Sequence, residues 1–291
     1  MRRHAYLPDM QVKPGSPTDH IEWIAAYLVE KKPDVIVNAG DFADMPSLSL
    51  YDAGKKEMEG RRFIADIDAA LKAMALLTDP IHAEIKRTVD GHRKRWSPEM
   101  HLTLGNHEAR ITRAISNDAK LDGILGLHSL EYEKFGWIVH DFLKPVEIDG
   151  VSYCHYYVNP MTGRPYAGAS MDARLKTVGF SFTMGHQQGK IIGSRELNNG
   201  TVLRGLVAGS AYLHDEEYKG YQGNGHWRGI IMKSEVRNGQ YDLMEVSLDY
   251  LCRKYEGCYV WQFMKKKYPE IYQSSMWLQK MEHMDTRRKA A

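Results

Sequence analysis

In the first part of the chain, short apolar runs alternate with longer segments whose apolar residues recur at helical spacing. The short runs lie at 3–8, 34–39 and 100–104. The longer segments lie at 19–30, 61–88 and 107–116. Short apolar runs are typical of buried strands, and the helical spacing is typical of amphipathic helices. The alternation predicts strand–helix–strand units with parallel strands.

After this part, the pattern changes to closely spaced strand candidates. They lie at 136–140, 145–148, 151–155, 180–184, 201–208, 228–235 and 241–248. Asp149-Gly150 and Asn238-Gly239 each separate two of these candidates, as the two-residue turn of a hairpin does. Helices are expected at 170–178 and again over 250–288. We therefore predict an α/β body over 1–248 and a C-terminal helical appendage over 249–291.

Composition and charge exclude several classes of protein. Hydrophobic residues make up 43% of the chain and the formal net charge is +2, which excludes a fully disordered chain and a nucleic-acid binder that relies on bulk positive charge. Basic stretches at 61–62 and 92–96 are expected to form solvated surface, with a local nucleic-acid contact as the alternative. No run approaches the roughly 18 apolar residues of a membrane span. Three cysteines, and an N-terminus without an apolar signal core, favour a cytoplasmic protein.

Polar residues cluster at the points where the predicted strands end. These are Asp9 and Gln11, the segment 40–44, the segment 105–108, His155, and the segment 185–188. In α/β sheets, ligands bind beyond the carboxyl ends of the strands, so these loops are expected to converge on one site. Carboxylate, amide and imidazole groups suit divalent metal ions better than they suit an apolar ligand.

In order and spacing, these blocks resemble those of the calcineurin-like metallophosphoesterases. That family carries D-x-H, G-D-x-x-D, G-N-H-[ED], a lone His and G-H-x-H. This chain has Asp9-x-Gln11, Gly40-Asp41-x-x-Asp44, Gly105-Asn106-His107-Glu108, His155 and Gly185-His186-x-Gln188. The resemblance covers 9–188 and implies an αββα sandwich of two mixed sheets flanked by helices. Sequences with Gln in the first block are similar to phage-encoded members.

The resemblance also implies a role for each residue of the blocks. It implies two divalent metal ions bridged by Asp41. The residues implied for the first ion are Asp9, Gln11 and Gln188, and those implied for the second are Asn106, His155 and His186. His107 would be the general acid, oriented by Asp44, and not a ligand. A water between the two ions, its pKa lowered by them, would attack phosphorus.

Two blocks depart from the family pattern, and both departures fall on the first ion. Gln11 and Gln188 stand where the family has His. Amide oxygens are neutral, hard and weak ligands, which favours Mn²⁺, Mg²⁺ or Ca²⁺ over zinc at the first site and predicts weak binding there. We expect Mn²⁺, with Mg²⁺, Ca²⁺, Fe and Zn²⁺ as alternatives. Because both changes fall on one site, they favour an altered site over an inactive enzyme.

Several assignments have alternatives that the sequence leaves open. His155 lies in an aromatic strand, where a core histidine is the competing interpretation. Arg110 and Arg113 begin a predicted helix and suit phosphate binding, although a solvated helix face explains them equally well. His214 and His226 are expected in a solvated loop, with a loop that lines the site as the alternative.

Together, the residues and the resemblance predict a metal-dependent phosphoesterase that hydrolyses a phosphodiester or phosphomonoester. One alternative is a nuclease acting on DNA or RNA, whose binding would weaken strongly with salt. Another is a metal-binding scaffold without catalysis, against which the retained pair of His107 and Asp44 argues. The methionines and tryptophans of the appendage predict packing, either on the body or in a homo-oligomer. No membrane partner is expected.

Overall fold

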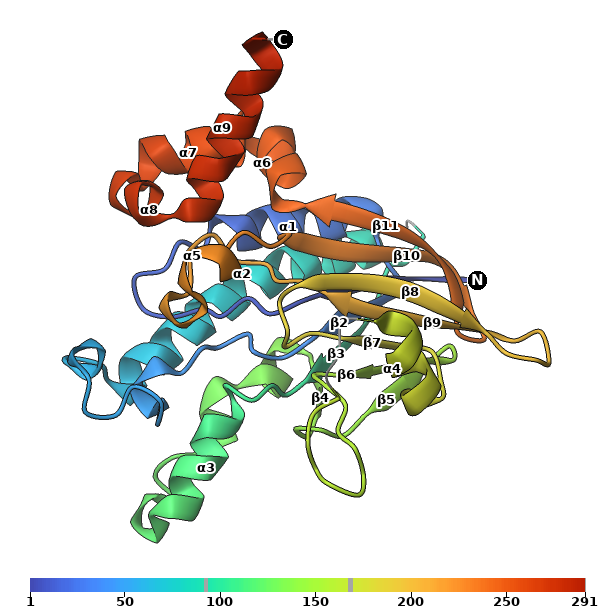
Figure 1. The fold of residues 1–291 in the computed structure, drawn as a ribbon, viewed down its shortest axis with the longest axis horizontal. Coiled ribbons are helices and arrows are strands. Elements are labelled where there is room, and N and C mark those ends of the chain that lie inside the picture. The colour runs from blue at the N-terminus through green and yellow to red at the C-terminus, as the bar shows by residue number, and fades with distance from the viewer. Residues whose placement is uncertain (92–93, 167–169, 291) are drawn as a thin grey trace.

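The computed structural model describes residues 1–91, 94–166 and 170–290, which form a mixed α/β fold with two mixed sheets (Figure 1). The strands are β1 (Arg2–Leu7), β2 (Val35–Asn38), β3 (Glu99–Thr103), β4 (Ile138–His140), β5 (Val146–Ile148), β6 (Val151–Cys154), β7 (Phe182–Met184), β8 (Lys190–Glu196), β9 (Val202–Ala208), β10 (Gly229–Arg237) and β11 (Gln240–Ser247). The α-helices are α1 (Asp19–Lys31), α2 (Phe63–Asp90), α3 (Ala109–Asn117), α4 (Met171–Val178), α5 (Gly220–Gly223), α6 (Leu248–Glu256), α7 (Val260–Lys267), α8 (Pro269–Ser274) and α9 (Met276–Ala290). Short 3-10 helices lie at Pro46–Leu48, Lys56–Met58, Ala119–Leu121, Leu127–Leu130, Tyr132–Phe135 and Glu217–Lys219. The α/β class expected from the sequence is confirmed.

The first sheet contains the strands of the alternating part of the chain. Its order is β11-β10-β1-β2-β3-β4. Strands β1 to β4 run parallel, and β10 and β11 are antiparallel to their neighbours. Every residue of β2 is buried, as expected of a parallel strand covered on both faces. The parallel strands therefore end at the same edge of this sheet.

The second sheet has the order β5-β6-β7-β9-β8, with β6, β7 and β9 parallel. Its edge strand β8 was not predicted from the sequence. Its residues alternate between partial burial and exposure, so it lacks the apolar run of a buried strand. It also contains Gly193, at which a Cβ would lie only 2.7 Å from the side chain of Met171 on α4. The strand therefore has a glycine, which is rare inside strands, because α4 packs closely on it.

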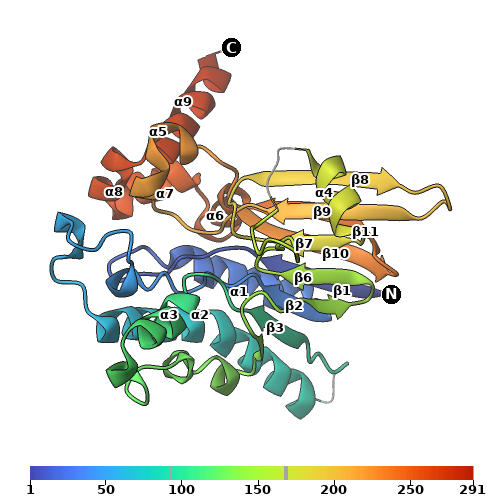
Figure 2. The same cartoon turned by 60° about the horizontal axis from the view of Figure 1, so that its bottom comes forward.

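The two sheets pack face to face, and helices cover their outer faces (Figure 2). Tyr6 and Val37 of the first sheet belong to the same buried cluster as Tyr153 and Leu206 of the second. The outer face of the first sheet packs with α1 and α2 in the largest apolar cluster. The outer face of the second sheet is covered by α4, through Leu175. The layers are thus helix, sheet, sheet and helix.

The C-terminal segment forms four helices, α6 to α9, within the region expected to be helical. Leu251 of α6, Met264 of α7 and Leu278 of α9 are fully buried in the same cluster as Leu28 of α1. The side chain of Asp19 on α1 also accepts a hydrogen bond from the Tyr268 hydroxyl, at 2.7 Å. Of the two interpretations of this segment, packing on the body is therefore the one that the structure contains.

Both predicted hairpin turns are confirmed. Asp149 and Gly150 have φ of 52° and 80°, and Asn238 and Gly239 have φ of 49° and 78°. Two successive residues with positive φ are the geometry that links antiparallel strands through two residues. Within the residues that the structure describes, no helix combines the length and the apolar character needed to cross a bilayer.

Candidate metal centre

The loops that follow the parallel strands of both sheets meet at one edge of the sandwich. Asp9 follows β1, Asp41 follows β2, and Asn106 follows β3. His155 follows β6 and His186 follows β7 in the second sheet. The convergence of these five loops was expected from the sequence, and the structure places them together.

Four of these residues form a cluster of potential metal ligands. Ligand atoms of Asp41, His155 and His186 all lie within 4.8 Å of one another. The Nε2 of His155 lies 2.9 Å from the Oδ1 of Asn106 and 3.2 Å from the Oδ2 of Asp41. We call Asp41, Asn106, His155 and His186 the Asp41 cluster. Imidazole nitrogens with carboxylate and amide oxygens suit Mn²⁺, iron or Zn²⁺.

The environment of His155 distinguishes a ligand from a core histidine. Its ring is fully buried, and Nδ1 lies 2.8 Å from the backbone oxygen of Ala39. A proton on Nδ1 makes that hydrogen bond and leaves the lone pair of Nε2 facing Asp41. Burial lowers the pKa of His155, but the charge and hydrogen bond of Asp41, together with the charge of Asp9, outweigh burial and raise the pKa to about 9. Positive charge is thus stabilised at this position, and a proton and a metal ion would compete for Nε2.

Carboxylates are also buried around the cluster. Asp9 and Asp41 are at most 1% exposed. Burial and the charge of Asp41 raise the pKa of Asp9 to about 7, although the charge of His155 opposes the increase. Buried carboxylates of this kind are stable only when paired with positive charge or bound to a cation. The residues present therefore fit a divalent metal ion at the Asp41 cluster.

The backbone is strained at four of the predicted site residues. Gln11, Asp41, His186 and Gln188 have φ of 44°, 47°, 65° and 57°. A non-glycine residue in the left-handed region costs about 1–3 kcal/mol, and such residues concentrate at functional sites. All four residues lie in the loops that follow the parallel strands.

The glycines of the blocks allow close approach to the carboxylates. A Cβ at Gly105 would lie 2.1 Å from the Oδ1 of Asp41, and a Cβ at Gly185 would lie 2.3 Å from the Oδ1 of Asp9. Any side chain at these positions would displace a carboxylate of the centre. The glycine in each motif is thus explained by packing against its acidic neighbour.

Glu108 holds two of the loops together, a role that the sequence did not assign. Its buried carboxylate accepts hydrogen bonds from the backbone N–H groups of Asp41, Phe42, Ala43 and Gly105, at 2.8–3.1 Å. The loop after β2 is therefore fixed to the loop after β3 through one side chain. The sequence did contain a signal for a role at the site, because Glu108 is the last residue of the block that contains His107.

His107 lies beside the cluster and contacts the residue expected to orient it. Its Nδ1 is 2.6 Å from the Oδ1 of Asp44. Its Nε2 is 3.7 Å from the Oδ2 of Asp41 and 3.4 Å from the guanidinium of Arg110. Burial lowers the pKa of His107, but the carboxylates of Asp41 and Asp44 outweigh burial and raise it. His107 is thus held by Asp44 and favoured in its protonated form.

The two arginines predicted to bind phosphate differ in position. Arg110 donates to the backbone oxygen of Asp44 at 2.7 Å and lines the pocket described below. Arg113 is exposed on α3 and lies outside that lining in the described part of the chain. Arg110 is therefore within reach of a ligand at the centre.

The three residues predicted for the first metal ion differ in their hydrogen bonds. The Oδ2 of Asp9 and both amide atoms of Gln11 are buried and make no hydrogen bond of ordinary geometry among the described residues, although the Tyr218 hydroxyl lies near Gln11. The Oε1 of Gln188, in contrast, accepts from the Tyr212 hydroxyl at 2.7 Å and from the Nζ of Lys219 at 2.6 Å. Gln188 is thus occupied by protein donors.

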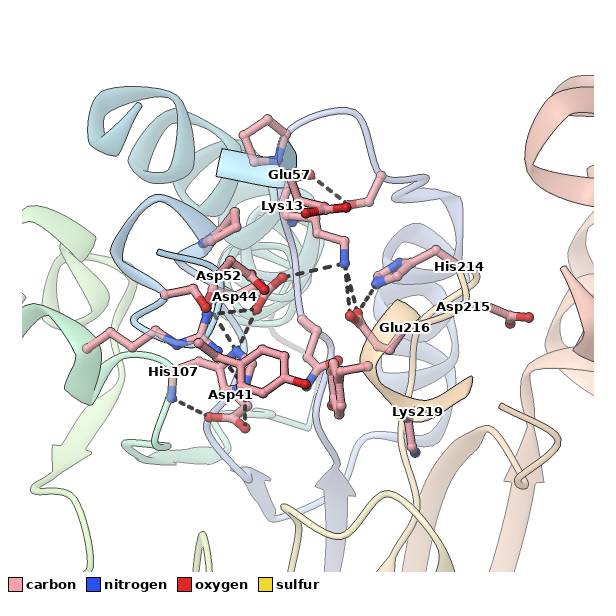
Figure 3. A pocket seen from close by; sticks show the side chains of 18 of the residues that line it. Lys13, Asp41, Asp44, Asp52, Glu57, His107, His214, Asp215, Glu216 and Lys219 are labelled. Atoms are coloured by element: carbon pink, nitrogen blue, oxygen red, sulfur yellow. Dashed lines mark hydrogen bonds and ion pairs between the residues drawn. The ribbon is translucent and has the colours of Figure 1, made fainter. Parts of the chain in front are cut away.

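A pocket of about 980 Å³ opens over the centre (Figure 3). One wall comes from the segment 49–61 and another from the segment 214–219. Figure 3 shows Lys13 reaching between two carboxylates, with its Nζ 2.9 Å from Glu216 and 3.5 Å from Asp44. His214, expected in a solvated loop, is only 7% exposed and lies 2.6 Å from Glu216. That expectation was wrong, because the segment folds back over the centre.

The predicted basic patch is also corrected in part. Residues 92–93 lie outside the described residues. Trp96 is buried, and its Nε1 donates to the backbone oxygen of Pro33 at 2.7 Å, so its ring presents no free face for a base. Arg61 instead lines the pocket, where it pairs with Asp52 at 2.9 Å.

Comparisons with known proteins identify no family. No family model matches the chain, and no curated protein matches it. One solved crystal structure aligns with 84% of this chain and 99% of its own chain, at 10% sequence identity and a TM-score of 0.40. A likeness at this level establishes neither family nor function, and the metallophosphoesterase resemblance stays a prediction.

Proposed function

We propose that this protein is a metal-dependent phosphoesterase of the calcineurin-like kind, which hydrolyses a phosphate ester in the pocket over the Asp41 cluster. The observation that carries the proposal is the position of His107. It lies next to a group of four metal-ligand side chains and is held at Nδ1 by Asp44. A metal site with an adjacent, oriented acid is the arrangement that phosphoester hydrolysis needs.

The Asp41 cluster would hold the metal, and its mixed nitrogen and oxygen donors suit Mn²⁺, iron or Zn²⁺, of which we expect Mn²⁺. When bound, such an ion supplies Lewis-acid polarisation of the phosphoryl group and lowers the pKa of water. An imidazole binds metal in its neutral form, so an ion bound here would displace the Nε2 proton of His155, whose pKa is raised to about 9. Burial lowers the pKa of His186 to about 4, with the charge of His155 adding to the effect, so that His186 is unprotonated and able to bind metal at neutral pH.

His107 would act as the general acid. The Nδ1 proton is held by Asp44, and Nε2 faces the pocket side of the cluster next to Arg110. As water forms its bond to phosphorus, the bond to the leaving oxygen breaks and Nε2 gives its proton to that oxygen. The raised pKa of His107 supports this role, since an acid must be protonated at the working pH. Arg110 would bind a phosphoryl oxygen.

A polymeric substrate is the second candidate, and the size and lining of the pocket favour it. Tyr51 and Tyr218 line the pocket and are 72% and 55% exposed. Exposed aromatic rings beside cationic side chains suit single-stranded nucleic acid, whose bases stack on them. Such a substrate would bind with a steep dependence on salt, whereas a small ester would not.

The experiment is hydrolysis of a chromogenic phosphodiester and of the matching monoester, with Mn²⁺ and with a chelator, alongside a labelled single-stranded oligonucleotide. Turnover that needs Mn²⁺ supports the proposal, and the preferred substrate defines the class. Absence of turnover of all three substrates by folded, metal-loaded protein would contradict it and favour a non-catalytic scaffold.

A further inference from the structure

Gln188 binds a lysine at the position where the resembled family has a metal ligand. Its side chain is 2% exposed, and its Nε2 donates to the Tyr218 hydroxyl at 3.1 Å. Its Oε1 accepts from the Nζ of Lys219 at 2.6 Å and from the hydroxyl of Tyr212 at 2.7 Å. A carbonyl oxygen has two lone pairs, and both are used here. Gln188 therefore has no lone pair left for a metal ion.

The two donors to Gln188 are themselves fixed in place. Tyr212 is fully buried, and the guanidinium of Arg228 lies 4.7 Å from the centre of its ring. The Nζ of Lys219 also lies 3.4 Å from the Nδ1 of His226. Lys219 is thus held by its neighbours and is not a freely moving surface lysine.

Lys219 also lies in the wall of the pocket over the Asp41 cluster. It lines the same pocket as His107 and Asp41, and Figure 3 places it beyond Glu216, on the side opposite Lys13. A divalent ion bound next to its ammonium group would be repelled by it. The lysine therefore supplies a single positive charge where the family pattern places the first ion.

We infer that the centre holds one tightly bound divalent ion, on the Asp41 cluster, and that Lys219 contacts the phosphoryl group from the side of the missing first ion. Gln188 is then a positioning residue that orients Lys219. The inference rests on the proposed function for its ligand, a phosphate ester. The lining of the pocket indicates the class of ligand, and the hydrogen bonds of Gln188 indicate the number of ions.

Asp9 keeps a role in this arrangement without binding metal. Its Oδ1 accepts from the backbone N–H of His186 at 3.0 Å, which fixes the turn that carries this cluster ligand. Burial and the charge of Arg228 lower the pKa of Lys219 to about 8, and the charge of Asp9 opposes this decrease. The carboxylate thus balances an ammonium group in place of a second metal ion.

The first test counts metal ions. Wild-type protein is loaded with Mn²⁺, dialysed and analysed for metal, and we expect one tightly bound Mn²⁺ per chain. In the triple variant Gln11→His, Gln188→His, Lys219→Met, which restores the family pattern and removes the ammonium, we expect two. Two tightly bound ions in the wild type would overturn the inference.

The second test measures binding of inorganic phosphate to the Mn²⁺-loaded protein by calorimetry. Lys219→Met should weaken phosphate binding at least tenfold with unchanged Mn²⁺ content, and Lys219→Arg should recover most of the loss. Lys190→Met is the matched control. Lys190 lies two positions after Gln188 in the sequence and pairs with Glu245. Its substitution is expected to leave phosphate binding unchanged. Equal phosphate affinity in wild type and a folded Lys219→Met variant would overturn the inference.

Neither test depends on turnover. One tightly bound ion and Lys219-dependent phosphate binding in a protein that hydrolyses no ester would support the inference and contradict the proposed function. Metal-dependent hydrolysis with two tightly bound ions would do the reverse.

Discussion

At the scale of single residues, the contacts of His107 support a role in proton transfer distinct from the metal binding proposed for the Asp41 cluster. Its Nδ1 contacts Asp44, and its Nε2 is farther from Asp41 than a hydrogen bond allows. In the proposed mechanism, a group in this position would transfer a proton and would not hold the ion. The same separation makes its role testable.

We expect His107→Ala to reduce kcat by about 10²–10⁴-fold, the usual contribution of a general acid. The Mn²⁺ content should stay that of the wild type, because the Asp41 cluster remains intact. His283→Ala, which changes an exposed histidine on α9, is the control and should retain full activity. Loss of metal together with activity would show that His107 is a ligand.

His20 on α1 gives a prediction about pH. Burial, assisted by the charge of His214, lowers its pKa to about 3, against about 6.5 in an unfolded chain. Below pH 6.5 the unfolded chain binds a proton that folded His20 does not, so the stabilising contribution is lost as the pH falls toward 3. Between pH 7 and pH 5 this lowers the free energy of unfolding by about 2 kcal/mol.

Urea unfolding at pH 7 and pH 5 measures this effect. His20→Gln should lose about 2 kcal/mol less than the wild type over this interval, since glutamine does not titrate. An equal loss in both proteins would place the acid sensitivity elsewhere.

The residues that meet in the Asp41 cluster could be predicted, but the hydrogen bonds of Gln188 could not. Asp41 and His155 are identified by local motifs that end strands. The contact between Gln188 and Lys219 spans 31 positions and exists only because the segment after β9 folds back over the centre. No local pattern encodes that fold, so Lys219 was missed.

At the scale of elements, the centre depends on loops more than on the strands that support them. The strands of the buried parallel sheet were predicted because their apolar runs are short and continuous. The edge strand β8 was missed because neither of its faces is fully buried. The loops are fixed by contacts between them, and the side chain of Glu108, in the loop after β3, accepts three hydrogen bonds from the backbone of the loop after β2.

Replacing Glu108 by Gln tests this connection between loops. The amide NH₂ would face backbone N–H donors, leaving at least two of them unsatisfied. We expect a loss of about 2–3 kcal/mol in the free energy of unfolding and weaker Mn²⁺ binding, because the loop that carries Asp41 is released. Glu133→Gln changes an exposed glutamate and should alter stability by less than about 0.5 kcal/mol. Unchanged stability and metal affinity in Glu108→Gln would contradict the role given to this side chain.

At the scale of the whole molecule, the C-terminal helices are part of the main core. The α/β body followed from the sequence pattern, but the way the last helices pack did not, since their apolar residues suit a core and an oligomer interface equally. The structure places Met264 in the cluster that α1 and α2 share.

Met264→Ala tests this packing. Met264 is fully buried, so truncation should cost about 3 kcal/mol through lost burial and the cavity left behind. Met284 on α9 is 50% exposed, and Met284→Ala should change stability by no more than about 0.5 kcal/mol. Thermal or urea unfolding distinguishes the two. A similar, small effect of both substitutions would mean that the helices do not stabilise the body.

The most direct test of the central claim follows Mn²⁺ binding and ester hydrolysis in the same samples. Metal-free protein is titrated with Mn²⁺ while bound ion is measured by electron paramagnetic resonance and turnover by a chromogenic phosphate ester. We predict that turnover rises with occupancy of the Asp41 cluster, and that His155→Ala loses both the bound ion and the turnover. Turnover that is unchanged in metal-free protein or in His155→Ala would contradict a metal-dependent phosphoesterase centred on this cluster.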